Sequence, residues 1–237
     1  MQVAILCGGL GTRLRADAQS LPKPLVEIGG HPILWHVMQG YARCGFTDFL
    51  LCLGFGREAI EAYVRRPGAV PASWHIECVD TGLDTNTGGR LKRLESRLRD
   101  ATFCATYADG VANLDIRTLV AFHAQHGRIG TVTLVNPPSQ FGEVVVGEDE
   151  RVTAFQEKPR LPRWINGGFF VFQREIFRYL DDQAVLEREP LEALVRDRQL
   201  CGFTHTGFWC CMDTYKDTLA LNELCRSGTP PWMTEGS

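Results

Sequence analysis

The sequence has no excess of positive charge. Its 237 residues include 25 lysines and arginines against 28 aspartates and glutamates, which gives a formal net charge of −3. A nucleic-acid-binding domain ordinarily carries a basic patch or stripe, so this balance argues against a nucleic-acid partner. An anionic substrate must then be held by a few well-placed basic side chains and by backbone N–H groups.

Long hydrophobic runs are also missing. No stretch approaches the roughly 18 consecutive apolar residues of a membrane span. The first apolar run, Val3–Leu6, is too short for the core of a signal peptide and leads directly into glycines. We therefore expect a cytoplasmic protein that works without a membrane.

The cysteines lack the spacing of a metal site. There are nine of them, an odd number, and no Cys-x-x-Cys occurs. Five lie among apolar residues, as buried free thiols do: Cys44, Cys52, Cys78, Cys104 and Cys201. Cys210 and Cys211 are adjacent, which is poor geometry for a shared zinc ion. The pattern favours free thiols in a reducing compartment and argues against a zinc site.

The first half of the chain alternates strand and helix patterns. Short apolar runs predict five strands, at Val3–Leu6, Phe49–Leu53, Trp74–Val79, Thr102–Tyr107 and Thr131–Val135. Helical patterns lie between them, from Pro32 towards Gly45, at Glu58–Arg65, at Arg90–Leu98, and from Asp115 to Gly127. This repeat predicts an α/β fold, a Rossmann-like and mostly parallel sheet flanked by helices.

The second half predicts an addition to that sheet. Short strands at Val144–Val146, Val152–Phe155 and Gly168–Phe172 are broken by Gly, Asp and Pro, and they suggest a small mixed β insertion at about residues 138–172 over one sheet edge. No linker or repeat marks a boundary, so we expect one domain over residues 1–237. Residues 228–237 are expected to form a loose tail.

A glycine-rich loop follows the first strand. Residues 6–14 read Leu-Cys-Gly-Gly-Leu-Gly-Thr-Arg-Leu, and Pro-Lys-Pro follows at residues 22–24. Glycines allow the backbone to approach a ligand and to aim N–H groups at phosphate oxygens. Arg13 and Lys23 add positive charge at the carboxyl end of the strand, where ligands of parallel sheets bind. The loop matches neither a P-loop nor the dinucleotide fingerprint, whose third glycine is missing around Leu14. A plain tight turn with solvated charges is the alternative.

Two aspartates are candidate metal ligands. Asp109 precedes Gly110 at the end of an apolar strand, and Asp213 follows Met212 in the last quarter of the chain. If both face the crevice, they can hold Mg²⁺, which usually takes one or two carboxylates together with phosphates and water. The alternatives are an ordinary Asp-Gly turn, and a helix cap if Asp213 precedes a helix starting near Tyr215.

Three further segments carry groups that suit a phosphorylated sugar or a nucleotide. Glu157-Lys158 precedes Pro159, and Asn166 precedes two glycines. At a cleft, Glu can accept hydrogen bonds from sugar hydroxyls and Lys can pair with a sugar phosphate, although a solvated ion pair is the simpler alternative. Gly88-Gly89 leads into a helix, a natural site for an anion or a ribose unless it is a plain loop.

These motifs, in this order, resemble the sugar-1-phosphate nucleotidyltransferases, and within them most of all the glucose-1-phosphate cytidylyltransferases. The likeness runs from residue 1 to about Trp232. It covers Gly-Gly-x-Gly-Thr-Arg-Leu, Pro-Lys-Pro, Asp-Thr-Gly with Thr-Gly-Gly-Arg-Leu-Lys-Arg, Asp-Gly, Glu-Lys-Pro, Asn-Gly-Gly and Met-Asp-Thr. The chain departs from the pattern at Ala108, at Cys210-Cys211, and in a shorter segment between Tyr63 and Trp74.

The resemblance implies a GT-A-like fold and a role for each motif. The nucleotide would be bound by Leu6, Gly8, Gly9, Gly11, Thr12, Gly88 and Gly89. Arg13 and Lys23 would stabilise charge on the triphosphate, and Asp109 and Asp213 would hold Mg²⁺. The sugar phosphate would be bound by Phe141, Gly142, Glu157, Lys158 and Asn166.

The implied reaction transfers CMP from CTP to a sugar 1-phosphate, most simply glucose 1-phosphate, with release of pyrophosphate. It also implies a homo-oligomer. Three alternatives stay open. The enzyme can use another sugar phosphate or another base, such as that of UTP or dTTP, or the chain can be a non-catalytic nucleotide-sugar-binding protein. The third alternative is an NAD-type dehydrogenase, which the incomplete dinucleotide-binding fingerprint opposes.

Overall fold

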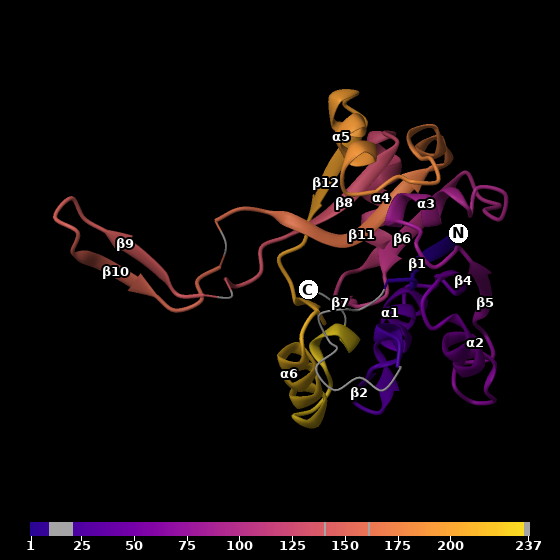
Figure 1. The fold of residues 1–237 in the computed structure, drawn as a ribbon, viewed down its shortest axis with the longest axis horizontal. Helices are drawn as coiled ribbons and strands as arrows, with labels where there is room; N and C mark the ends of the chain where they lie inside the picture. Colours follow the sequence, from indigo (N-terminus) through magenta and orange to yellow (C-terminus); the bar gives the residue numbers. More distant parts are fainter. Residues whose placement is uncertain (10–20, 140, 161, 235–237) are drawn as a thin grey trace.

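A seven-stranded sheet forms the centre of the computed structural model, which describes residues 1–9, 21–139, 141–160 and 162–234 (Figure 1). Its strands, in spatial order, are β12 (Leu200–Thr204), β8 (Gly130–Val135), β11 (Ile165–Gln173), β6 (Thr102–Tyr107), β1 (Gln2–Leu6), β4 (Asp48–Leu53) and β5 (His75–Asp80). Neighbouring strands are parallel except for the two pairs that include β11. The predicted α/β class with a mostly parallel sheet is confirmed.

Helices cover both faces of the sheet, which gives three layers. Because successive strand residues point to opposite faces, Val3 and Ile5 of β1 join one core while Ala4 and Leu6 join the other. The first core is completed by α1 (Ile33–Ala42), α2 (Arg57–Arg65), α4 (Ile116–His126) and α6 (Tyr215–Arg226). The second is completed by α3 (Thr87–Lys92), α5 (Glu189–Arg196) and the 3-10 helix η3 (Arg174–Tyr179). No helix within the described ranges combines the length and the apolar character that crossing a membrane requires.

Helix α3 differs from the prediction. The sequence predicted a helix at Arg90–Leu98, but α3 begins at Thr87 and ends at Lys92. The first basic residue, Arg90, is buried rather than solvated. The two glycines before it lie inside the helix, where they pack directly against residues 182–184.

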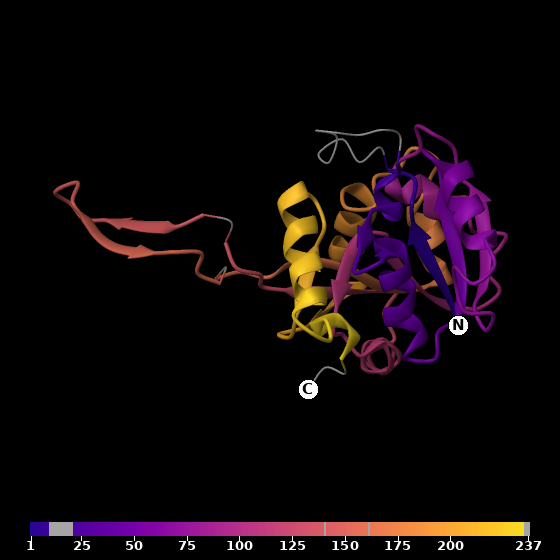
Figure 2. The same cartoon turned by 90° about the horizontal axis from the view of Figure 1, so that it is seen from below.

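Strand β11 also differs. The sequence placed Gly168–Phe172 in an insertion over the sheet edge, but these residues lie within the sheet, between β8 and β6. The glycines before the aromatic run suggested a chain break. They instead permit close approach, since a Cβ at Gly167 would lie 2.9 Å from a methyl carbon of Val135. Of the three strands predicted for this insertion, β9 (Glu143–Val146) and β10 (Val152–Gln156) lie outside the sheet. They form an antiparallel ribbon that projects far from the body of the molecule (Figures 1 and 2).

The expected loose tail is ordered as far as the structure describes it, to residue 234. Residues Pro231–Met233 form a 3-10 helix (η4), and Trp232 is buried. The Trp232 indole donates a hydrogen bond of 3.1 Å to Nδ1 of His36. Arg43 donates to the carbonyl oxygens of Trp232 and Thr234 at 2.7 and 2.6 Å. A large aromatic residue among Gly, Pro and Thr therefore anchors the end of the chain on α1.

Candidate active site

Two short strands bring distant parts of the chain together beside the carboxyl end of β6. Asp109 lies in the turn between β6 and β7 (Gly110–Ala112), and β7 pairs antiparallel with β13 (Trp209–Cys211). In this register Cys211 lies opposite Gly110, and the N–H of Met212 donates to the Asp109 carbonyl oxygen at 2.9 Å. The pairing therefore delivers Asp213 beside Asp109.

Lys23 bridges the two aspartates. Its ammonium nitrogen lies 2.6 Å from Oδ2 of Asp109 and 2.8 Å from Oδ1 of Asp213. The 3-10 turn η2 (Lys23–Leu25) fixes its backbone, and the N–H of Leu25 donates to the Pro22 carbonyl oxygen at 2.8 Å. Burial alone would lower the pKa of Lys23, but the two carboxylates raise it above its usual value, so the side chain stays an ammonium cation.

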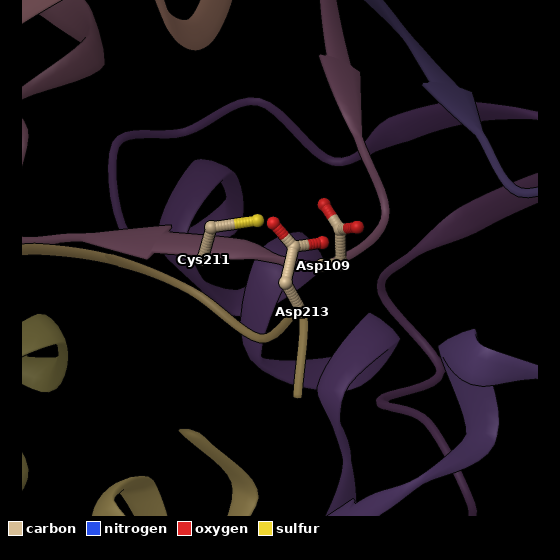
Figure 3. A group of neighbouring side chains, drawn as sticks. All are labelled: Asp109, Cys211 and Asp213. Carbon is tan, nitrogen blue, oxygen red and sulfur yellow. The ribbon is translucent and has the colours of Figure 1, made fainter. Parts of the chain in front are cut away.

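Cys211 is the third member of this group (Figure 3). Its sulfur and one oxygen from each of Asp109 and Asp213 lie within 4.8 Å of one another, close enough to hold a metal ion. Burial, followed by the two nearby carboxylates, raises the pKa of the Cys211 thiol, so the group is neutral until a cation approaches. The two carboxylates suit Mg²⁺, which takes oxygen ligands and keeps phosphate or water in its other positions.

Asp213 is not the cap of the following helix. The N-cap of α6 is Thr214, whose hydroxyl accepts from the N–H of Asp217, while the Asp217 carboxylate accepts from the N–H of Thr214 at 2.7 Å. This reciprocal capping box satisfies the helix start by itself. The Asp213 carboxylate is therefore directed to Lys23 rather than to the helix.

The glycine-rich loop is described only at its beginning. Leu6 ends β1, and Gly8 and Gly9 follow it, but Gly11, Thr12 and Arg13 lie outside the described residues. The surroundings of the two glycines differ sharply. A Cβ at Gly8 would lie 2.1 Å from a guanidinium nitrogen of Arg90, whereas one at Gly9 would meet nothing within 4 Å. Gly9 is exposed, so its backbone is open to a ligand.

Arg90 is a structural residue that the sequence reasoning missed. Its buried guanidinium donates to the carbonyl oxygens of Leu53, Gly82, Leu83 and Gly8 and to the hydroxyl of Thr81, at 2.8–3.1 Å. These acceptors follow the carboxyl ends of β1, β4 and β5 or lie at them. One cation therefore ties together the three loops that surround the mouth of the site. The sequence shows only an arginine after two glycines, a pattern that a surface residue also gives.

Gly88 and Gly89 are held by packing against the 182–184 segment. A Cβ at Gly88 would lie 2.8 Å from the Cβ of Ala184, and one at Gly89 would lie 2.4 Å from the Asp182 carbonyl oxygen. The N–H of Gly89 donates to the Ala184 carbonyl oxygen at 3.0 Å. This packing accounts for both glycines without a ligand, and their role toward a nucleotide stays a prediction.

The predicted sugar-phosphate residues fall into two groups. Asn166 lies at the start of β11, and because β11 runs antiparallel, this end meets the carboxyl ends of β8 and β6. The other four lie where the ribbon begins and ends: Phe141, Gly142, Glu157 and Lys158. Glu157 and Lys158 form an exposed ion pair of 3.4 Å, and Lys158 has a φ of 45°, uncommon for a residue other than glycine. The described hydrogen bonds and ion pairs join neither of them to Lys23 or Asp109.

Comparisons with known proteins agree on one family. The nucleotidyl transferase family matches residues 2–214. A probable glucose-1-phosphate cytidylyltransferase of Bacillus subtilis is 39% identical over 98% of this chain and 99% of its own length, and the glucose-1-phosphate cytidylyltransferase of Salmonella typhi is 40% identical over 99% of each. A mannose-1-phosphate guanyltransferase of Neurospora crassa is 33% identical over 97% of this chain and 66% of its own length.

Solved structures support the fold. The chain is similar to HddC from Yersinia pseudotuberculosis complexed with GMP-PN, with a TM-score of 0.72, 22% identity, and coverage of 94% of this chain and 98% of that one. A putative glucose-1-phosphate thymidylyltransferase from Bacillus anthracis also gives a TM-score of 0.72, with 19% identity and 96% of both chains covered. By its sequence over nearly its whole length, this chain belongs to the nucleotidyl transferase family.

Proposed function

We propose that the protein transfers CMP from CTP to glucose 1-phosphate, releasing pyrophosphate and forming CDP-glucose. The observation that carries this proposal is the 39–40% identity to glucose-1-phosphate cytidylyltransferases, which extends over 98–99% of this chain and 99% of theirs. The guanyltransferase relative is less similar, and this chain spans only 66% of its length. Full-length likeness therefore favours the cytidylyl reaction over the guanylyl one.

The group around Lys23 supports a transfer between phosphates. Asp109 and Asp213 would hold Mg²⁺, which supplies charge neutralisation at the triphosphate oxygens when bound. Lys23 would then pair with phosphate oxygens instead of with the two carboxylates, and Arg13 would add a second positive charge. The attacking sugar phosphate is already anionic near neutral pH, so these residues position and neutralise rather than remove a proton.

The ribbon supports a homo-oligomer. Five of its side chains are large, apolar and about half exposed or more, at Val144 (49%), Val145 (58%), Val146 (60%), Val152 (62%) and Phe155 (64%). A lone soluble chain rarely exposes so many large apolar side chains on one projecting element. We propose that the ribbon packs against other copies of the chain, with the sugar-phosphate residues at its base.

A two-way substrate screen tests the proposed reaction. Pyrophosphate release is measured with CTP, UTP, dTTP, ATP and GTP, each against glucose 1-phosphate and mannose 1-phosphate, in the presence of Mg²⁺. We expect CTP with glucose 1-phosphate to be fastest. A preference for another pair would overturn the cytidylyl assignment and keep the transferase, whereas no release with any pair would favour a binding protein.

A further inference from the structure

The Cys211 thiol lies in the candidate metal group but has no part in the proposed reaction. Its sulfur approaches the carboxylates of Asp109 and Asp213, and Figure 3 shows the side chain directed at Asp213. The β7–β13 pairing sets this position, because Cys211 lies directly opposite Gly110. The neighbouring Cys210 faces elsewhere, with its sulfur 3.7 Å from the Cys211 carbonyl oxygen.

A second observation shows that this group attracts cations. The Lys23 ammonium already lies between the two carboxylates, 2.6 and 2.8 Å from their oxygens. A divalent cation that displaces Lys23 would meet two carboxylate oxygens and one sulfur. Mg²⁺ prefers oxygen ligands, so the sulfur adds nothing to its binding. Zn²⁺ and Cd²⁺ accept thiolate together with carboxylate, so the third donor matters for them alone.

We propose that Asp109, Cys211 and Asp213 form a binding site for thiophilic divalent cations such as Zn²⁺ and Cd²⁺. Metal binding replaces the proton on the Cys211 sulfur and the Lys23 ammonium beside the carboxylates. The Cys211 thiol gives up its proton to solvent and its sulfur bonds to the metal, while the Lys23 ammonium leaves the carboxylates with its charge intact. The cation takes the same carboxylates that we assign to Mg²⁺, so it blocks the proposed transferase reaction. Only this inhibitory consequence rests on the proposed function.

Cadmium titration of the full chain without nucleotide tests the site directly. Cadmium–thiolate bonds absorb in the ultraviolet, so the absorbance at saturation reports sulfur ligation. We expect Cys211→Ala to lose this absorbance and to bind Cd²⁺ at least about 10- to 100-fold more weakly, since even the loss of a group that only supports a metal ligand has an effect of this size. Cys210→Ala is the matched control and should keep both. Equal absorbance and affinity in the wild type and Cys211→Ala would overturn the proposal.

Two further measurements separate this proposal from the proposed function. Asp213→Asn should weaken Cd²⁺ binding while leaving the protein folded by circular dichroism; unchanged affinity would remove the carboxylate from the site. In the pyrophosphate assay with excess Mg²⁺, Zn²⁺ should inhibit, and its inhibition constant should rise about 10-fold in Cys211→Ala. An identical inhibition constant in the two proteins would contradict the shared site. If no substrate pair reacts, the proposed function fails, whereas the cadmium titration still decides the site.

Discussion

Lys23 and a divalent cation would compete for the same two carboxylates. The ammonium occupies the position between Asp109 and Asp213 at hydrogen-bond distance from both. A cation bound between these carboxylates would be repelled by the Lys23 ammonium, and the phosphates of a nucleotide would offer Lys23 new partners. We therefore expect metal and nucleotide to bind more tightly together than either binds alone.

Replacing Lys23 tests this competition. Lys23→Met removes the competing charge and keeps the length of the side chain, so Mn²⁺ should bind the nucleotide-free protein about 10-fold more tightly. Pyrophosphate release should fall about 100-fold, because the triphosphate loses a positive partner. Manganese binding is measured by electron paramagnetic resonance. Lys92→Met, which removes an ion pair with Glu95, is the control and should change neither quantity. Unchanged Mn²⁺ affinity in Lys23→Met would contradict the competition.

Gly8 and Gly9 offer a second comparison at single positions. In Gly8→Ala, the new methyl group would collide with the Arg90 guanidinium, which cannot move without abandoning its buried acceptors. We expect a loss of about 1–3 kcal/mol in the free energy of unfolding, as for other overpacked sites. Gly9→Ala meets open space and should change it by less than about 0.5 kcal/mol. Urea denaturation measures the free energy of unfolding of both variants. Equal losses would show that the Arg90 side chain moves aside at little cost.

At the level of single residues, the chemical type of a side chain can be read from the sequence, whereas its neighbours cannot. Asp109, Asp213 and Lys23 were candidates because carboxylates and a lysine suit a metal and a phosphate, and the structure brings them together. Their roles stay predictions. Arg90 and Cys211 received no role, because the depth of a side chain and its neighbours across β13 depend on pairing between distant segments. Nothing in the local sequence encodes those contacts.

Helix α4 packs on β8 through a chain of hydrogen bonds. The N–H of Arg128 donates to Nδ1 of His126, so Nε2 of His126 donates to the Thr131 hydroxyl, which in turn donates to Nδ1 of His123. Burial, assisted by the neighbouring His126, lowers the pKa of His123 to about 4. Both ring nitrogens would become donors on protonation, leaving the Thr131 hydroxyl without its acceptor.

This contact predicts a loss of stability in mild acid. Below about pH 6.5, His123 is protonated in the unfolded chain but not in the folded chain. The free energy of unfolding therefore falls as the pH drops from about 6.5 to 4. Above that range, His123 does not affect it. We expect about 2 kcal/mol less between pH 7 and pH 5. His123→Asn keeps an acceptor near the position of Nδ1 and should flatten this dependence, whereas the exposed His75→Asn should not. Parallel pH profiles for the wild type and His123→Asn would refute this assignment.

The 3-10 helix η4 is expected to hold the end of the chain on α1. Trp232→Ala should cost about 3–5 kcal/mol, since Trp232 is buried against His36 and Phe208. Trp232→Phe keeps most of the apolar contact and loses only the hydrogen bond to His36, so its cost should be clearly smaller. Thermal unfolding of both variants checks this order. A cost near zero for Trp232→Ala would mean that the segment is not anchored.

The elements themselves were largely predictable, because apolar runs and helix ends are local signals. The strand predicted at Phe49–Leu53 became β4 at Asp48–Leu53, and the helix expected between Asp115 and Gly127 became α4 with those two residues as its caps. The location of β11 was not predictable in this way. Its place between β8 and β6 is decided by which sheet edge can bury Phe169–Phe172, and that choice depends on the whole fold.

At the level of the whole molecule, the ribbon predicts assembly. Val146→Glu would place a charge in the proposed contact between copies and should shift the protein towards monomer, as measured by sedimentation velocity. Val195→Glu on α5 is the matched control, because both valines are 60% exposed. It should leave the assembly unchanged. A wild-type protein that sediments as a monomer at micromolar concentration would refute the proposal.

The position of β11 also sets an order of events during synthesis. The chain completes β8 at Val135, but β8 touches the earlier strands only through β11, which ends at Gln173. In a nascent chain that has just passed Val135, the edges of β6 and β8 that pair with β11 in the finished sheet are therefore both still open, and the ribbon between β8 and β11 is still to be made. Open edges are templates for wrong pairing, and non-local strands close slowly. Almost forty residues must be added after Val135 before β11 can pair with both β8 and β6, so we expect the chain to be open to wrong pairing with other unfinished chains during this interval.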